Sequence, residues 1–187
     1  MRIISGKAKG TKLYTLEGNT TRPTLDRVKE SIFNIIQNEV KNSIFLDLFA
    51  GSGAIGLEAA SRGAKKAILC DKSKEAMSII KRNIEKTHLE QNVETYLDDY
   101  KKVLENKIKE KLDIIYIDPP YESDCAINSI KIILKKELIT KDSIIMIETD
   151  RKKEIEESLK EIELEIIDQR KYGRAEIIFL KQRQRSN

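Results

Sequence analysis

The sequence contains few of the residues that build disulfide frameworks and metal centres, and no long apolar run. Only two of its 187 residues are cysteine and one is histidine. Cys70 and Cys125 form no metal-type cluster and no disulfide framework, so we expect buried or half-buried thiols in a reducing cytoplasm and no bound metal. No stretch approaches the roughly 18 consecutive apolar residues of a membrane span, and residues 1–6 lack the apolar core of a secretory signal. We therefore expect a cytoplasmic protein outside the membrane.

Charged residues are abundant, and their distribution is uneven. Residues 1–30 carry seven lysines and arginines against three acids, residues 171–187 carry five against one, and the remaining residues carry 23 against 27. Basic ends on a mildly acidic body suit a phosphate-rich partner that is held by the terminal segments. Solvated surface charge in a chain rich in lysine and glutamate would give the same counts, so charge alone leaves both interpretations open.

From residue 44 onward, short apolar runs alternate with stretches of helical spacing. The expected strands are 44–49, 67–70, 93–97, 112–117 and 143–147, and the expected helices are 55–62, 74–86, a charged helix from after Asp99 to about 111, 124–136 and 152–160. Strands separated by helices pair in parallel through right-handed crossovers, which predicts a mostly parallel, doubly wound α/β sheet within a single domain. The last two runs, 164–167 and 176–180, leave no room for a helix, so we expect one antiparallel strand near an edge.

The residues before this pattern form an N-terminal extension. Residues 1–22 predict short extended segments with turns at glycines. Residues 24–38 predict a helix, because Leu25, Val28, Ile32 and Ile35 make an apolar stripe. Thr24 is a candidate N-cap of this helix.

Four acids stand at or near the carboxyl ends of the first four expected strands: Asp47, Asp71, Asp99 and Asp118. In an open parallel sheet those ends share one edge, where the ligand crevice lies. Carboxylates gathered in one crevice repel each other unless a cation or hydrogen-bond donors lie among them. The pattern therefore predicts a ligand that carries positive charge, although any one acid could simply cap a helix.

The first loop contains a G-x-G-x-x-G pattern at Gly51, Gly53 and Gly56, with Asp71 twenty residues after Gly51. Alone, this pattern matches a dinucleotide-binding loop. Asp47 at its mouth would repel a pyrophosphate but attract the ammonium group of a methionine moiety. The loop therefore favours S-adenosylmethionine over a nicotinamide dinucleotide. A purely structural glycine turn is the remaining alternative.

Asp118-Pro119-Pro120-Tyr121 is the most specific motif in the chain. The lone pair of an aromatic amine is delocalised, so two acceptors aimed at its N–H groups would stabilise the charge that develops as a methyl group arrives. The Asp118 carboxylate and the Pro119 carbonyl can be these acceptors, Pro119 and Pro120 stiffen the loop, and Tyr121 can stack on a base. The structural alternative is a Pro-Pro turn that ends a strand. In contrast, we expect His88 at the surface, and Tyr172-Gly173 in a turn.

These residues resemble the bacterial 16S rRNA guanine-N2 methyltransferases, and the resemblance covers essentially the whole chain. The segments that carry it are 1–6, 9–13, Arg22-Pro23-Thr24, 26–30, 32–34, 47–53, 57–59 and 118–121. The Arg-Pro-Thr segment with its Asp-Arg-Val helix is the narrowest of these motifs. Gly173-Arg174-Ala175 departs from the family, in which glycine is followed by an acid and threonine.

The resemblance implies a Rossmann-like S-adenosylmethionine-dependent methyltransferase fold and transfer to N2 of a small-subunit guanine, guanine 966 in that family. It implies that Asp47, Gly51, Ser52 and Gly53 hold the methionine end and that Phe49 also contacts the cofactor. Asp71 would then hold the ribose, Asp99 or its neighbour Asp98 the adenine, and Asp118 to Tyr121 the guanine amine. The expected substrate contacts are Lys7, Lys9, Lys12, Arg22 and Thr24. The expected partner is 16S rRNA or the small ribosomal subunit, and we expect the protein to be a monomer.

Other functions remain compatible with the motifs. A DNA methyltransferase acting on adenine N6 or cytosine N4 uses the same Asp-Pro-Pro-Tyr box, but such enzymes usually need a larger recognition segment than residues 1–40 offer. A protein-glutamine methyltransferase would present a side-chain amide to the same box. A non-catalytic RNA-binding assembly factor with this fold is the alternative from a different class.

Overall fold

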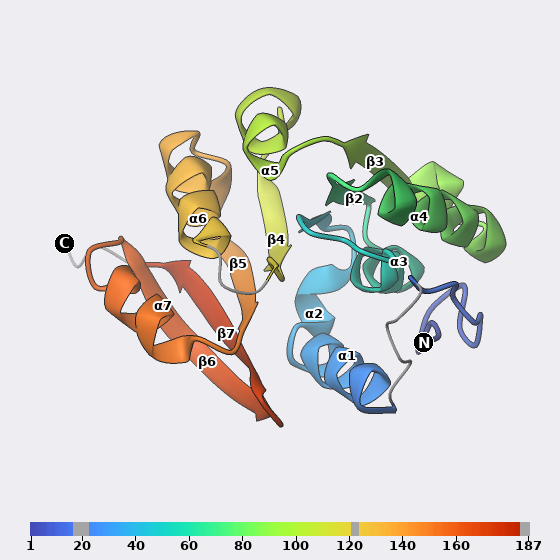
Figure 1. Cartoon of the computed structure of the whole chain (residues 1–187), viewed down its shortest axis with the longest axis horizontal. Coiled ribbons are helices and arrows are strands. Elements are labelled where there is room, and N and C mark those ends of the chain that lie inside the picture. The colour runs from blue at the N-terminus through green and yellow to red at the C-terminus, as the bar shows by residue number, and fades with distance from the viewer. Residues whose placement is uncertain (17–22, 121–123, 184–187) are drawn as a thin grey trace.

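The computed structural model describes residues 1–16, 23–120 and 124–183, with the backbone alone for residues 23–25, and it forms one α/β unit (Figure 1). The strands are β1 (Ile44–Asp47), β2 (Lys66–Asp71), β3 (Val93–Leu97), β4 (Leu112–Ile117), β5 (Ile139–Thr149), β6 (Leu164–Tyr172) and β7 (Ala175–Gln182). The helices are α1 (Pro23–Ile35), α2 (Gln37–Val40), α3 (Ala54–Ser61), α4 (Lys74–Thr87), η1 (Glu90–Asn92), α5 (Tyr100–Lys102), η2 (Val103–Lys107), α6 (Cys125–Lys135) and α7 (Lys152–Leu159). No helix in these described ranges is long and apolar enough to cross a membrane.

The strands form one sheet in the order β3-β2-β1-β4-β5-β7-β6. Neighbours from β3 to β5 pair in parallel, while β7 pairs antiparallel with both β5 and β6. The order reverses between β1 and β4, so the crevice at the carboxyl ends of these two strands is the expected ligand site of a doubly wound sheet. The predicted fold class and the single antiparallel strand near one edge are confirmed.

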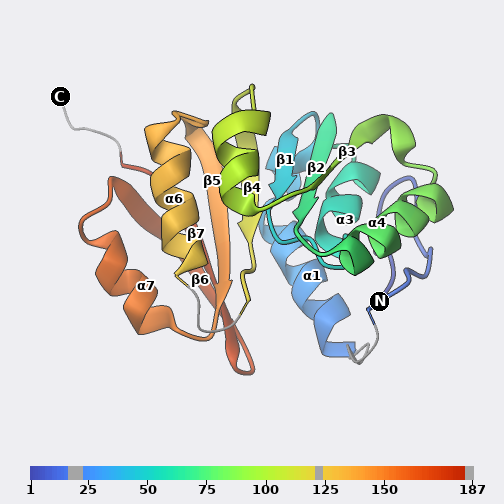
Figure 2. The ribbon, with the colours of Figure 1, turned by 45° about the horizontal axis from the view of Figure 1, so that its top comes forward.

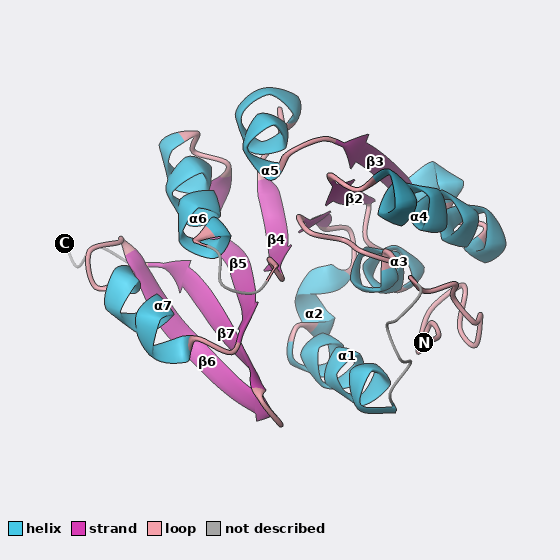
Figure 3. Cartoon of the chain, viewed as in Figure 1, coloured by secondary structure: helices cyan, strands magenta, loops and turns pink. Residues whose placement is uncertain are grey.

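Alternate residues of the central strands pack on opposite faces of the sheet, as the period of two in a strand requires. In β1, Leu46 belongs to the core under α5, α6 and α7, whereas Phe45 belongs to the core under α1. Ile115 and Ile114 of β4 divide in the same way. Helices therefore cover both faces, which explains why these strands are apolar throughout (Figures 2 and 3).

The structure corrects four predicted elements. The helix predicted at 24–38 begins at Pro23 and breaks after Ile35, so Thr24 lies in its first turn and is not its N-cap. The charged helix predicted up to 111 ends at Lys107, because its last turn widens and the Ile108 amide donates to the Val103 carbonyl, 3.1 Å away. The two last strands are longer than their apolar runs, since backbone pairing continues through exposed polar residues of β6.

The N-terminal segment, residues 1–14, is docked on α3 through a buried carboxylate. Glu58 is fully buried, and its carboxylate accepts the backbone N–H groups of Ile4 (2.8 Å) and Ser5 (3.0 Å). It also pairs with Lys29 (3.2 Å) and Arg62 (2.7 Å). Because a buried charge is tolerated only when it is paired and hydrogen-bonded, Glu58 joins the N-terminal segment, α1 and α3 into one unit.

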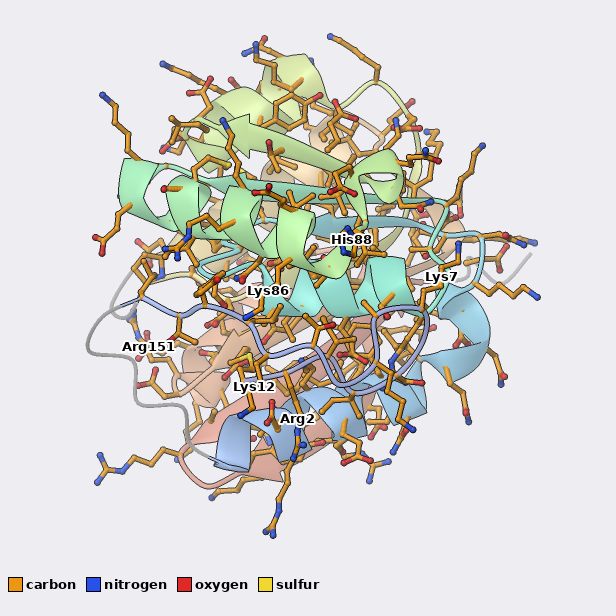
Figure 4. The ribbon with its side chains drawn as sticks, turned by 90° about the vertical axis from the view of Figure 1, so that its right-hand side faces the viewer. Arg2, Lys7, Lys12, Lys86, His88 and Arg151 are labelled. Atoms are coloured by element: carbon orange, nitrogen blue, oxygen red, sulfur yellow. The ribbon has the colours of Figure 1, made fainter. Side chains whose placement is uncertain are left out.

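Further contacts hold the segment along its length. The Lys7 amide donates to the Ser61 carbonyl at 2.9 Å, and Gly6 at φ +85° lies so close that an added Cβ would fall 1.9 Å from that same oxygen. At the far end, Asn83 of α4 exchanges hydrogen bonds with the backbone of Tyr14 at 2.7 and 2.9 Å. The segment is therefore part of the packed structure and crosses between α1 and α4 (Figure 4).

We expect Glu58→Gln to lower the free energy of unfolding by about 3 kcal/mol, because Lys29 would stay buried without its counter-charge. Urea denaturation at pH 7 measures this change, with Glu39→Gln on the exposed face of α2 as the matched control. A Glu58→Gln variant within about 0.5 kcal/mol of the unaltered protein would contradict the assigned role.

Candidate active site

A cleft of about 590 Å³ lies at the carboxyl edge of the sheet, where the strand order reverses. Acidic side chains from the ends of five strands and their loops line it: Asp47, Asp71, Asp98, Asp99, Asp118 and Glu148. Two lysines also line it, but Lys29 is already paired with Glu58. The four acids predicted from the sequence are therefore brought together in one cleft, as the topology requires. No group of three or more side chains suited to binding a metal occurs in the described part of the chain.

Asp47 is the most deeply placed of these acids. Its side chain is 1% exposed, and its Oδ2 accepts the Gly56 amide at 3.0 Å. Its buried Oδ1 has no hydrogen-bond partner within the described residues. Burial, and to a smaller extent the repulsion of Asp71, raises the pKa of Asp47 to about 7. An unsatisfied buried carboxylate oxygen at the wall of a cleft is complementary to a ligand that donates hydrogen bonds and carries positive charge.

The glycines of the first loop have three different roles. Gly51 lines the cleft at φ +56°, and its amide donates to Asp71 at 2.9 Å, which ties the loop to the end of β2. Gly53 is the left-handed residue before α3, and an added Cβ would fall 2.9 Å from Leu69. At Gly56 that distance to Leu69 is 2.5 Å. Gly53 and Gly56 therefore permit close packing of α3 on the sheet, and Gly51 and Ser52 are the loop residues open to the ligand.

Asp71, Asp98 and Asp99 line the next part of the cleft. Asp71 already accepts the amides of Gly51 and Ser73, so it shapes two loops as well as lining the cleft. Asp99 is the N-cap of α5 and accepts the Lys101 amide at 2.9 Å, while Asp98 accepts the Asp99 amide at 2.9 Å. Both neighbours retain accessible carboxylate surface, so the geometry keeps both as candidates for an adenine contact.

Two aromatic side chains form part of the wall of the cleft. Phe49 from the first loop and Tyr100 from α5 pack with ring centroids 5.3 Å apart. Both line the cleft, together with the free thiols of buried Cys70 and half-buried Cys125. The predicted cysteine environments are confirmed, whereas Tyr100 is a site residue that the sequence pattern did not reveal.

Asp118, Pro119 and Pro120 follow β4 and line the cleft, whereas Tyr121 lies outside the described residues. The Asp118 side chain is open to the cleft but surrounded by protein and other acids. Its partial withdrawal from water, followed by the repulsion of Glu148 and Asp47, raises its pKa well above the ordinary value. Asp118 is thus a cleft carboxyl whose affinity for a proton is raised by its surroundings.

Glu148 near the end of β5 was also missed, although it follows the apolar run Ile144–Ile147 just as Asp118 follows its own strand. It lines the cleft, and the hydroxyl of Tyr116 donates to its Oε2. A search for acids after every apolar run, including the fifth, would have found it.

A second pocket of about 260 Å³ lies on the other side of the Asp118 loop. Asp118, Pro119, Pro120 and Glu148 line both spaces, so they form the shared wall. Arg151 before α7 and Arg174 in the β6–β7 turn line the second pocket. The departure from the family at residues 173–175 therefore lies at this pocket.

The three predicted substrate lysines lie apart from the cleft, since none of them lines it. Lys7, Lys9 and Lys12 are exposed on the docked N-terminal segment, with Lys7 at one end and Lys12 between Arg2 and Lys86 at the other (Figure 4). The backbone of Thr24 lies in the first turn of α1, and Arg22 lies outside the described residues. His88 is the exposed, left-handed C-cap of α4, as expected for a surface residue. Tyr172-Gly173 is the expected turn.

Comparison with known proteins relates this chain to others over most of its length. The family model described as "Conserved hypothetical protein 95" matches residues 1–181. The small-subunit ribosomal RNA methyltransferase D of Buchnera aphidicola (subspecies Acyrthosiphon pisum) is 36% identical over 82% of this chain and 80% of its own length. The protein of that name from Haemophilus influenzae is 32% identical over 82% and 80%. The solved structure of "Putative methyltransferase yhhF" from Escherichia coli superposes with a TM-score of 0.83 at 24% identity, covering 97% of both chains.

Asp47→Asn should stabilise the protein in the absence of ligand. In the folded protein Asp47 has a pKa of about 7, whereas its ordinary value is 3.8, so stability falls as the pH rises from about 4 to 7. We expect the variant to gain on the order of 2–4 kcal/mol at pH 8, since one pKa unit corresponds to about 1.4 kcal/mol, and less at pH 5. Urea denaturation at both pH values measures this, with exposed Asp142→Asn as control. An equal gain at pH 5 and pH 8 would show that Asp47 does not titrate in this range.

Proposed function

Because the chain belongs to the conserved hypothetical protein 95 family and is related to the curated small-subunit rRNA methyltransferases D, we propose that it is an RNA methyltransferase that transfers a methyl group from S-adenosylmethionine to N2 of a guanine in 16S rRNA. The observation that carries the proposal is the acidic cleft in which buried Asp47 keeps an unpartnered oxygen, among the described residues, beside a glycine loop. We propose a monomer that acts in the cytoplasm on the small subunit, with guanine 966 as the candidate nucleotide.

The residues of the cleft fit S-adenosylmethionine. Asp47 Oδ1 would accept the ammonium of the methionine moiety, and Gly51 and Ser52 let the backbone approach it. Asp71 would hold the ribose hydroxyls, and Asp98 or Asp99 the adenine amine beside Phe49. A nicotinamide dinucleotide would bring a pyrophosphate against the same acids, which disfavours it. When bound, the donor supplies an electrophilic methyl group on a cationic sulfur.

The residues of this chain would then orient and activate the acceptor amine. The Asp118 carboxylate and the Pro119 carbonyl accept the two amine N–H groups, which directs the nitrogen lone pair toward the methyl group. Both acceptors are fixed by the proline loop before charge develops, so they favour the transition state over the bound base. After transfer, Asp118 takes the released proton, as its raised pKa allows.

Two observations bear on the alternatives. Residues 1–14 are docked on α3 and α4, so they do not form a separate domain for reading DNA sequence. The unsatisfied Asp47 oxygen favours an occupied donor site over a fold kept only for RNA binding. Methylation of a release-factor glutamine or of DNA would exclude the RNA assignment.

The test of function is methyl transfer to small subunits from a strain that lacks the enzyme, followed by mapping of the modified base. We expect Asp118→Asn to lower the rate on the order of 100-fold or more, because one acceptor of the developing charge becomes a neutral amide. Calorimetry with S-adenosylmethionine should show binding close to that of the unaltered protein. Asp168→Asn on the hairpin is the matched control. Full activity of the Asp118→Asn variant would remove Asp118 from the mechanism.

We further propose that Lys7, Lys9, Lys12 and Arg22, with Thr24, bind the RNA outside the cleft. Replacing the four basic residues with alanine should weaken binding to small-subunit rRNA, because each of them would neutralise a phosphate. It should also flatten the dependence of binding on salt, by roughly 0.7 in the log–log slope for each phosphate that is no longer neutralised. Filter binding from low to moderate salt measures the slope. The control replaces exposed Lys107, Lys109, Lys135 and Lys136. If the two quadruple variants show the same dependence of RNA binding on salt, the RNA does not bind at Lys7, Lys9, Lys12 and Arg22.

A further inference from the structure

Glu148 occupies a position for which the proposed mechanism gives no role. It lies near the end of β5 and borders two spaces, since it lines both the cleft and the second pocket together with Asp118. Asp118 is the proposed acceptor of the target amine. A carboxylate beside it, as Glu148 is, will face the atoms of the base that adjoin that amine.

Tyr116 occupies one of the two carboxylate oxygens of Glu148 with a hydrogen bond. The tyrosine is 4% exposed in the core under α1, and its hydroxyl donates to Oε2 of Glu148. Burial first, then the negative charge of Glu148, raises the pKa of Tyr116 well above its ordinary value, so this hydroxyl remains a donor at neutral pH. Among the described residues, the Tyr116 hydroxyl is the one hydrogen-bond donor to the Glu148 carboxyl group, so Oε1 has no donor there. Glu148 lines both the cleft and the second pocket. The pair therefore presents one oriented acceptor.

Among the bases that carry an exocyclic amine, guanine is the one whose amine adjoins a ring N–H. The N2 amine of guanine lies beside N1–H, a donor, whereas the N6 amine of adenine lies beside N1 and the N4 amine of cytosine beside N3, both acceptors. A base removed from its helix is read along this edge. Two neighbouring acceptors, Asp118 and Glu148, thus match the two neighbouring donors of guanine and would repel the ring nitrogen of the other two bases.

The second pocket has a size and border suited to such a base. Its volume of about 260 Å³ is less than half that of the cleft, and it meets the cleft at Asp118. Arg174 at its border has no ion pair among the described residues, while Arg151 pairs with Glu154. A nucleotide could place its planar base in the second pocket, with its phosphates near Arg151 and Arg174.

We propose that Glu148 is the specificity-determining residue of this enzyme, which selects guanine by accepting its N1–H while Asp118 accepts the adjacent amine. The inference rests on the proposed function, because it assumes a nucleobase amine as acceptor. The two donors of guanine would relieve the repulsion between the two carboxylates, and neither of the other bases offers such a pair.

The test replaces the target guanine with 2-aminopurine, which keeps the N2 amine but has an acceptor at ring N1. Small-subunit rRNA assembled by ligation, with guanine or 2-aminopurine at the mapped position, is reconstituted into particles and methylated. We expect the unaltered protein to favour guanine by about 10- to 100-fold in kcat/KM, the range of a lost hydrogen bond to a charged group. Glu148→Gln should narrow this preference at least several-fold, since an amide can donate to the ring nitrogen. Glu176→Gln on β7, outside both pockets, should leave the preference unchanged.

The outcomes separate the two levels of the proposal. Equal methylation of both particles by the unaltered protein would overturn the role of Glu148 and leave the proposed function standing. An unchanged preference in a folded Glu148→Gln variant would also overturn it. If that variant fails to fold, the comparison of the two particles with the unaltered protein still decides. Absence of methylation on the guanine particle would overturn the proposed function and this inference with it.

Discussion

The carboxyl ends of parallel strands meet at a single edge of the sheet, and in this protein acids stand at or next to those ends. Asp47, Asp71 and Asp118 therefore come together although the chain separates them widely. Each would be unremarkable alone as a cap or a turn residue. Around one cleft, burial and then repulsion by neighbouring acids raise the pKa of Asp47 and of Asp118, and one buried oxygen of Asp47 has no donor among the described residues. The electrostatic cost of this arrangement is the main reason to assign the cleft to a ligand with positive charge and donor groups.

The surrounding fold keeps these acids in place. Gly56 allows α3 to lie directly against β2, and the Gly56 amide donates a hydrogen bond to the Asp47 carboxylate. Asp71 holds the glycine loop from the other side through Gly51. The same α3 carries Glu58, whose buried carboxylate docks the N-terminal segment. One short helix therefore connects the glycine loop with the segment that carries Lys7, Lys9 and Lys12, so the proposed donor and RNA sites share a rigid support.

Several parts of this arrangement could be predicted from the chain. Strand 112–117 was predicted with its observed bounds, because a buried parallel strand leaves a nearly continuous apolar run. Strand 93–97 also has its predicted bounds, although its residues are half-buried or exposed. The break after Ile35 could not be predicted, and neither could the wider turn that ends the helix at Lys107, because the spacing of apolar residues predicts a continuous helix in both segments. Glu148 was missed because its strand looked complete without it, and Tyr116 because a tyrosine inside an apolar run indicates core before it indicates a site.

Local patterns with local physical causes were enough to predict the order of elements, the acids that follow the strands, the glycine loop and the proline box. The folded arrangement was needed to find which carboxylate is buried without a partner among the described residues, and to find Glu148 and Tyr116 near Asp118. It was also needed to find that Glu58 holds the N-terminal segment. Burial and pairing depend on what distant segments bring to the same place, and no spacing along the chain encodes them.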